Sequence, residues 1–216
     1  MYSNVILAVI VLLYLWWKLY SNLRSVQIND SLDDLQTGDI FMGFYDPSKK
    51  KNKSIWNAIV LPYVVPITSY KVPVNHCGII YRNGDRLYLA SMDNAYPNDP
   101  DMPQEHGVHF EPLEKYIGGS KPRFDNVIFV KSKKNRGDNV WFNERFEKLK
   151  NAPLEYDHGA MGRRYFAVLT GIQIGPEYSG YTCSEWVNEF VTGDYRPNIL
   201  PDHWVPHVRG CSPNRR

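Results

Sequence analysis

The chain has 216 residues, enough for one sizeable domain and a short appendage. Its formal net charge at pH 7 is +2, so the overall charge gives no argument for binding nucleic acid. The three cysteines are scattered and odd in number, which excludes a disulfide framework, and no Cys/His spacing indicates zinc. Free thiols are typical of a reducing compartment, and we expect no metal and no other cofactor.

The N-terminal segment is apolar from residue 5 to residue 17 and has no charged side chain before Lys18. Its aromatic residues Trp16, Trp17 and Tyr20 are typical of a membrane interface. A cleaved signal peptide is the alternative, but the basic residues follow the apolar run, and Trp-Trp-Lys is a poor cleavage site. We therefore expect a single transmembrane anchor at residues 1–21, a tether at residues 22–31 and a domain at residues 32–216. The lipid bilayer is then a partner, and the positive-inside rule leaves the domain on the cytosolic side.

Within the domain, hydrophobic alternation and turn residues predict short strands, followed by helices. A turn leads into a strand across residues 34–42, and strands are expected at residues 74–81, 86–92, 108–110 and 127–131. Helices are expected at residues 54–60 and 139–150 and after Thr182. Strands in the middle with helices around them predict an α+β protein, with an antiparallel β-sheet packed against helices.

The dipeptide Asn83-Gly84 is the strongest short-range signal for a β-hairpin in this chain. If these two residues form the turn, pairing along the strands places His76 opposite Ser91, with Asp93 within diagonal reach on the same face. The hairpin then offers an imidazole with a hydroxyl and a carboxylate beside it, as a catalytic base requires. The alternative is a structural histidine with a satisfied hydrogen bond.

The segment around Cys183 predicts the start of a helix. Thr182 as N-cap and Glu185 three residues later form a capping-box pattern, apolar residues follow at helical spacing, and Gly193 ends the run. Cys183 then occupies the first helical position, where free N–H groups and the helix dipole favour a thiolate. A thiolate there is a nucleophile if a base can reach it, whereas the alternative is a small buried hydrophobic residue.

Three segments in this order resemble the circularly permuted papain-like enzymes of the NlpC superfamily, especially the YiiX/YaeF-like amidase group, and more distantly lecithin–retinol acyltransferase. They are Gly-Asp-Ile at residues 38–40, Asn-His-Cys-Gly-Ile-Ile at 75–80 and Tyr-Thr-Cys-Ser-Glu at 181–185. Supporting matches lie at residues 107–113, 156–157 and 200–202, so the resemblance covers about residues 32 to 205. It implies a circularly permuted papain-like fold, with a catalytic His preceding the catalytic Cys in the chain.

The resemblance implies that Cys183 is the nucleophile, that His76 is the base, and that the substrate forms a thioester. The backbone N–H of Cys183 would contribute to an oxyanion hole, with Tyr181 as a second donor and Thr182 beside it. The family places a Glu on the strand after the His strand, and counting through Asn83-Gly84 reaches Ser91 instead. A serine accepts a hydrogen bond from the imidazole N–H but cannot stabilise an imidazolium as a carboxylate does. Either Asp93 therefore orients His76, or Ser91 does so in an enzyme that is slow or inactive.

The substrate class stays open between a lipid and a peptide or other amide. Lysine-rich segments at residues 49–53 and 131–136 are able to meet anionic head groups, although such segments are usually only solvated. Because Ser91 stands where the family has Glu, the non-enzyme alternative is a membrane-tethered binding or scaffold module of the same fold.

Overall fold

A five-stranded antiparallel sheet, with the strand order β4-β3-β2-β1-β5, forms the centre of the computed structural model. The structure describes residues 10, 11, 14, 32–44, 74, 76–93, 105–118, 123–124, 126–153, 167, 172, 180–196 and 199. The strands are β1 (Ile40–Phe44), β2 (His76–Asn83), β3 (Arg86–Asp93), β4 (Gly107–Pro112) and β5 (Asn126–Val130), and a short 3-10 helix, η1 (Leu32–Asp34), precedes them. The strand that begins with the predicted base, β2, is the middle one.

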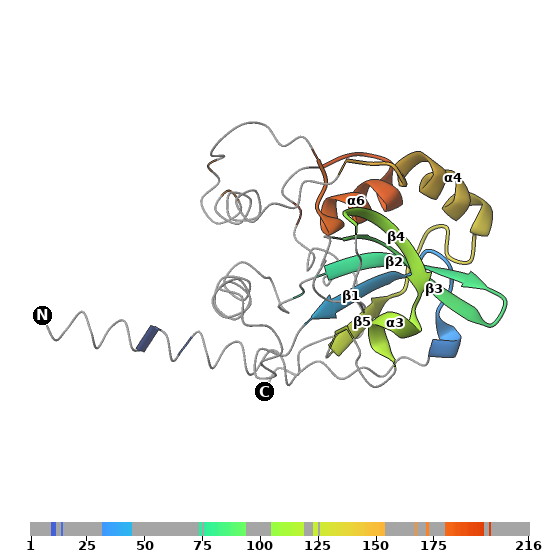
Figure 1. The fold of residues 1–216 in the computed structure, drawn as a ribbon, viewed down its shortest axis with the longest axis horizontal. Helices are drawn as coiled ribbons and strands as arrows, with labels where there is room; N and C mark the ends of the chain where they lie inside the picture. The colour runs from blue at the N-terminus through green and yellow to red at the C-terminus, as the bar shows by residue number, and fades with distance from the viewer. Residues whose placement is uncertain are drawn as a thin grey trace, which may run out of the picture.

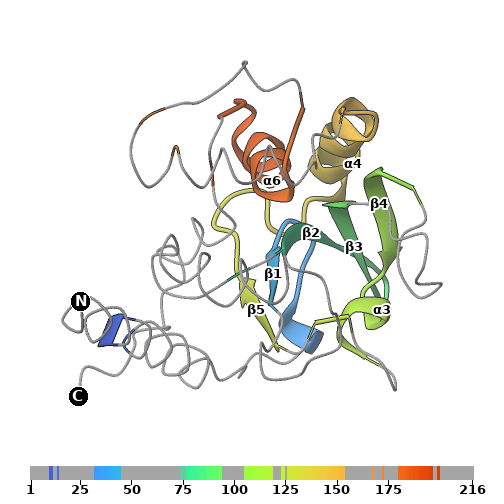
Figure 2. The same ribbon diagram turned by 60° about the vertical axis from the view of Figure 1, so that its left-hand side comes forward.

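Among the described residues, two helices cover one face of this sheet, and a short helix lies on the other (Figures 1 and 2). The first pair is α4 (Asn139–Leu149) and α6 (Cys183–Thr192), and the short helix is α3 (Glu114–Ile117). Since successive residues of a strand point to opposite faces, each strand supplies side chains to two separate cores. The core under α4 and α6 includes Ile79, Ala90, Met92, Trp186 and Phe190, and the core under α3 includes Phe41, Ile80, Leu89, Tyr116 and Phe124.

The Gly-Asp-Ile motif has a structural explanation at the start of β1. The buried carboxylate of Asp39 accepts hydrogen bonds from the backbone N–H groups of Gln36 and Ser132 and from Nε of Arg136. Gly38 has a φ of +89°, which favours glycine. These bonds tie the start of β1 to the loop after β5, so the motif closes this end of the sheet.

The hairpin between β2 and β3 is present, but its predicted register is wrong by two residues. Asn83 pairs with Arg86, so the loop is Gly84-Asp85, with Gly84 at a φ of +59° in the first position, as in a type II′ turn. Ser91 consequently pairs with Gly78, and not with His76. Because the shift is two residues and the side-chain period is two, every side chain keeps its predicted face.

The fold class is α+β with an antiparallel sheet and helices, as the sequence predicts. The predicted strands at residues 74–81, 86–92, 108–110 and 127–131 correspond to β2, β3, β4 and β5, and the predicted helix at residues 139–150 corresponds to α4. The lysine-rich segment at residues 49–53, the expected helix at residues 54–60, the tether and most of the anchor lie outside the described residues. Among the residues that are described, no helix has the length and apolar character needed to cross a membrane.

Candidate active site

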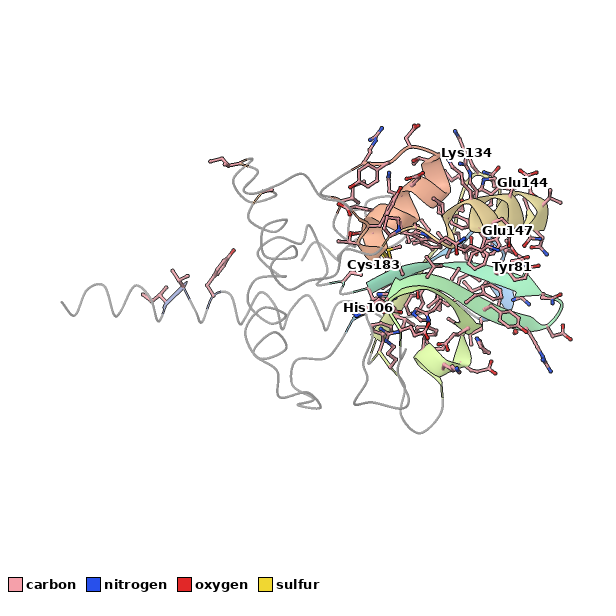
Figure 3. The ribbon with its side chains drawn as sticks, turned by 45° about the horizontal axis from the view of Figure 1, so that its top comes forward. Tyr81, His106, Lys134, Glu144, Glu147 and Cys183 are labelled. Atoms are coloured by element: carbon pink, nitrogen blue, oxygen red, sulfur yellow. The ribbon has the colours of Figure 1, made fainter. Side chains whose placement is uncertain are left out.

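Cys183 is the first residue of α6, as the capping pattern predicts (Figure 3). The hydroxyl of Thr182 accepts from the backbone N–H of Glu185, and the carboxylate of Glu185 accepts from the backbone N–H of Thr182. Gly193 closes the other end of the helix in the left-handed conformation. The sequence therefore fixes the position of Cys183 by a local signal, at the helix end where backbone N–H groups and the helix dipole favour negative charge.

The thiol of Cys183 lies against the start of β2. It is 2% exposed and belongs to the hydrophobic cluster between the helices and the sheet, together with Cys77. The two thiols are neighbours in this cluster. Burial raises the pKa of Cys77 well above its usual range, and its hydrogen bond and charge interaction with Cys183 raise it further. Cys77 is thus held as a neutral thiol beside the candidate nucleophile.

His76 is the first residue of β2 and pairs with Gly43 of β1. Its Nε2 atom lies 3.4 Å from Oδ2 of Asp93, and continuing the β2–β3 register by two residues brings these two residues opposite each other. The imidazole stacks on Phe124, with ring centroids 5.4 Å apart and the planes within 11° of parallel. Gly43 makes this possible, since a Cβ there would lie 2.6 Å from the Phe124 ring.

Asp93 is buried and surrounded by donors. Arg123 donates from both terminal nitrogens, one of them 2.7 Å from Oδ2 and the other to Oδ1, and the Ser91 hydroxyl lies 3.2 Å from Oδ2. Burial by itself would raise the pKa of Asp93, but the charges of His76 and Arg123 and the Arg123 hydrogen bonds lower it to about 2. Asp93 is therefore an anion next to the imidazole at any pH near neutrality.

The structure brings His76, Ser91 and Asp93 together on one face of the sheet, and α6 places Cys183 on the other face. Adjacent residues of a strand point to opposite faces, so Cys77 meets Cys183 while His76 meets Asp93 and Phe124. The thiol and the imidazole thus belong to two clusters on opposite faces of the sheet. One cluster contains Cys77 and the other contains its neighbour His76, and the Cα atoms of these two residues are about 3.8 Å apart.

Tyr181 and Thr182 use their donors within the fold. The Tyr181 hydroxyl donates to Glu189 at 2.5 Å, and its backbone N–H donates to the carbonyl of Pro153 at 3.0 Å. The Thr182 backbone N–H is taken by Glu185. These contacts anchor the chain before α6. The hydroxyl and the backbone N–H of Tyr181 both already donate to acceptors within the fold, and neither acceptor is an oxyanion.

Sequence reasoning missed Arg123, Phe124 and Cys77 as neighbours of the predicted pair. Arg123 and Phe124 lie between α3 and β5, outside any regular element, and no local pattern connects them with residue 93. Within the described ranges, no three His, Cys, Asp or Glu side chains are arranged to hold a metal ion.

Comparison with known proteins adds no relative. A scan against protein-family models finds none that matches the chain, and a search of curated proteins finds no match either.

Proposed function

We propose that this protein is a membrane-anchored thiol hydrolase or acyltransferase, with Cys183 as nucleophile and His76 as base. The main support for this proposal is the position of the thiol relative to the histidine and its carboxylate partner. The thiol at the head of α6 contacts Cys77, the residue next to His76, and a carboxylate stands 3.4 Å from Nε2 of that histidine. The thiol therefore lies at the same end of β2 as the imidazole and its carboxylate partner, with the thiol on one face of the sheet and the imidazole on the other. A catalytic pair of this kind needs a base beside its nucleophile and an anion beside the base.

Nε2 of His76 faces Asp93, so Nδ1 is the ring atom left to receive the thiol proton. The Cys183 thiolate then attacks an acyl carbonyl and gives a tetrahedral oxyanion, which the positive end of α6 stabilises. The oxyanion collapses to a thioester, and the leaving amine or alcohol takes the proton back from His76. Attack by water or an acceptor amine releases the acyl product and restores the thiol.

Asp93 is the better candidate for the third catalytic residue, and Ser91 supports it. The register places Ser91 opposite Gly78, where its hydroxyl donates to Asp93. Asp93 stabilises an imidazolium, which a hydroxyl cannot do. With the acid on the strand after the His strand, the order of residues agrees with a circularly permuted papain-like fold, which we include in the proposal.

The substrate is proposed to be an amide or ester, presented by a lipid or a peptide at the membrane that residues 1–21 would anchor. The basic segment after β5 supports a membrane contact only weakly. Arg136 is bound to Asp39, and Lys131 lies 3.8 Å from Asp34. Lys133 and Lys134 are the exposed lysines that remain in that segment, each able to contribute about 1 kcal/mol at an anionic surface.

A second candidate function is a binding or scaffold module of the same fold without turnover. The burial of Cys183 and its contact with another buried thiol favour this alternative, because small buried cysteines are usually inert.

A thiol-directed acyl probe applied to the full chain in detergent separates the two functions. We expect the probe to label Cys183 and to lose its label in Cys183→Ala and in His76→Ala. His106→Ala, at an exposed position before β4, is the matched control and should label normally. Undiminished labelling of the His76→Ala variant would rule out the catalytic pair and favour the scaffold.

A further inference from the structure

The side chain of Arg123 is 6% exposed, although it belongs to no helix or strand. Its two terminal nitrogens donate to the two oxygens of the Asp93 carboxylate. This two-point geometry fixes the plane of the carboxylate as well as its position, which a lysine ammonium is unable to do.

The aromatic ring of Phe124 aligns Arg123 with His76. The guanidinium carbon lies 5.3 Å from the centroid of Phe124, and the imidazole stacks on the same ring at 5.4 Å. The guanidinium is also 5.4 Å from the ring of Tyr116, which stacks on Phe124 within 8° of parallel. The cation and the imidazole are thus held by one rigid ring and meet at one carboxylate.

We propose that Arg123 is a positioning residue that fixes the Asp93 carboxylate, so that this carboxylate selects the tautomer of His76 with the proton on Nε2. This inference rests on the proposed function of His76 as the base. Oδ2 of Asp93 accepts hydrogen bonds from Arg123 and Ser91, and it lies 3.4 Å from Nε2 of His76, a buried nitrogen that has no hydrogen-bond partner among the residues that the structure describes. Without the two-point hold, the carboxylate is free to turn away from a ring that is already 3.4 Å distant.

The ionisable groups around His76 allow this role to be separated from a general effect of charge. On the face of the sheet where the His76 side chain lies, these groups are Asp93, His109, Glu111, Tyr116 and Arg123. On the opposite face, they are Cys77 of β2 and Cys183 of α6. Arg123→Lys keeps the cation among them and removes only the two-point geometry, whereas Arg123→Met removes both.

A second arginine–carboxylate pair provides the control. Arg136, whose side chain is 33% exposed, donates from Nε to the buried carboxylate of Asp39 at 2.9 Å. Arg136→Lys therefore removes an arginine–carboxylate bond at the opposite end of β1 from Gly43, the partner of His76. It reports the effect of a purely structural loss.

The experiment uses the full chain in detergent with isotope-labelled histidine, and the signal of His76 among the six histidines is identified by its loss in His76→Asn. Nitrogen chemical shifts of the neutral imidazole report which ring nitrogen carries the proton. We expect the Nε2–H form in the wild type and in Arg136→Lys, and a mixture of both tautomers in Arg123→Lys. The alkylation rate of Cys183 should fall about a hundredfold in Arg123→Lys, as expected for a misplaced catalytic geometry.

An unchanged His76 tautomer in Arg123→Lys would overturn the inference, and so would an equal change in Arg136→Lys. If Arg123→Met does not fold, the Arg123→Lys variant alone tests whether Arg123 positions the Asp93 carboxylate. A wild type in which Cys183 is unreactive would contradict the proposed function, while the tautomer measurement would still decide the role of Arg123.

Discussion

His76 and Asp93 contact each other as opposed residues at the ends of two adjacent antiparallel strands, with Nε2 3.4 Å from Oδ2. Both side chains are almost completely buried. A charged carboxylate is costly to bury unless it is paired, and Arg123 supplies the pairing. The site therefore places an imidazole beside a carboxylate that stays ionised and whose charge Arg123 largely balances, in an environment where water screens these charges little.

The ionisation of Asp93 should appear in the acid stability of the protein. Its pKa is about 2 in the fold and about 3.9 in an unfolded chain, so the carboxylate stabilises the fold above about pH 4, and this stabilisation is lost as the pH falls to about 2. We expect the gap in unfolding free energy between wild type and Asp93→Asn to narrow by about 2 kcal/mol over that range. Urea unfolding at several pH values measures it, and a gap independent of pH would contradict the assignment.

The cap of α6 should matter for reactivity as well as stability. Thr182→Ala removes the acceptor for the Glu185 N–H and should cost about 1 kcal/mol of unfolding free energy. It should also slow alkylation of Cys183, because the first helical turn loses its fixed geometry. Asp138→Ala removes the equivalent cap of α4, where the side chain accepts from the Trp141 N–H at 2.9 Å. Equal slowing in both variants would mean that only global stability matters.

Cys77 should be inert in the folded protein. Burial and its contact with Cys183 raise the pKa of the Cys77 thiol, so the nucleophilic thiolate is scarce at neutral pH. Mass spectrometry after brief iodoacetamide treatment should find Cys183 alkylated and Cys77 unmodified until the protein is denatured. Modification of Cys77 in preference to Cys183 would reverse the assigned roles.

Gly43 should tolerate no side chain. The Cβ of Gly43→Ala would lie 2.6 Å from the Phe124 ring, on which His76 stacks, so the ring has to move. We expect a loss of about 1–3 kcal/mol in unfolding free energy, together with slower alkylation of Cys183. Gly84→Ala is the control, because a Cβ there meets nothing within 4 Å and only the positive φ is strained. It should leave alkylation unchanged, and equal slowing in the two variants would contradict the role of Phe124.

The local signals in the sequence were enough to place the head of α6, because a capping box involves only Thr182 and Glu185. They were not enough for the hairpin register, since the chain contains both Asn83-Gly84 and Gly84-Asp85, and each dipeptide suits a two-residue turn. The observed register is accompanied by contacts with residues that are far away in the sequence. The guanidinium of Arg82 donates to the carbonyls of Leu32, Asp33 and Leu35, about fifty residues earlier in the chain.

The arginine that pairs with Asp93 could not be predicted from the sequence either, because this contact also joins residues that are far apart in the chain. Arg123 follows Asp93 by 30 positions and lies between elements, so neither helical nor strand periodicity relates the two residues. The register error also hid the direct opposition of His76 and Asp93 and made Ser91 appear to occupy the third position. Only the assembled sheet shows which carboxylate faces the imidazole.

The most direct test of the central claim is the pH dependence of Cys183 alkylation in the wild type and in His76→Asn. If His76 serves Cys183, the wild-type thiol should react rapidly down to about pH 6, and the variant should need a pH closer to the value of about 8.5 for a free cysteine. A wild-type profile centred near 8.5 that the His76→Asn substitution leaves unchanged would contradict the catalytic pair.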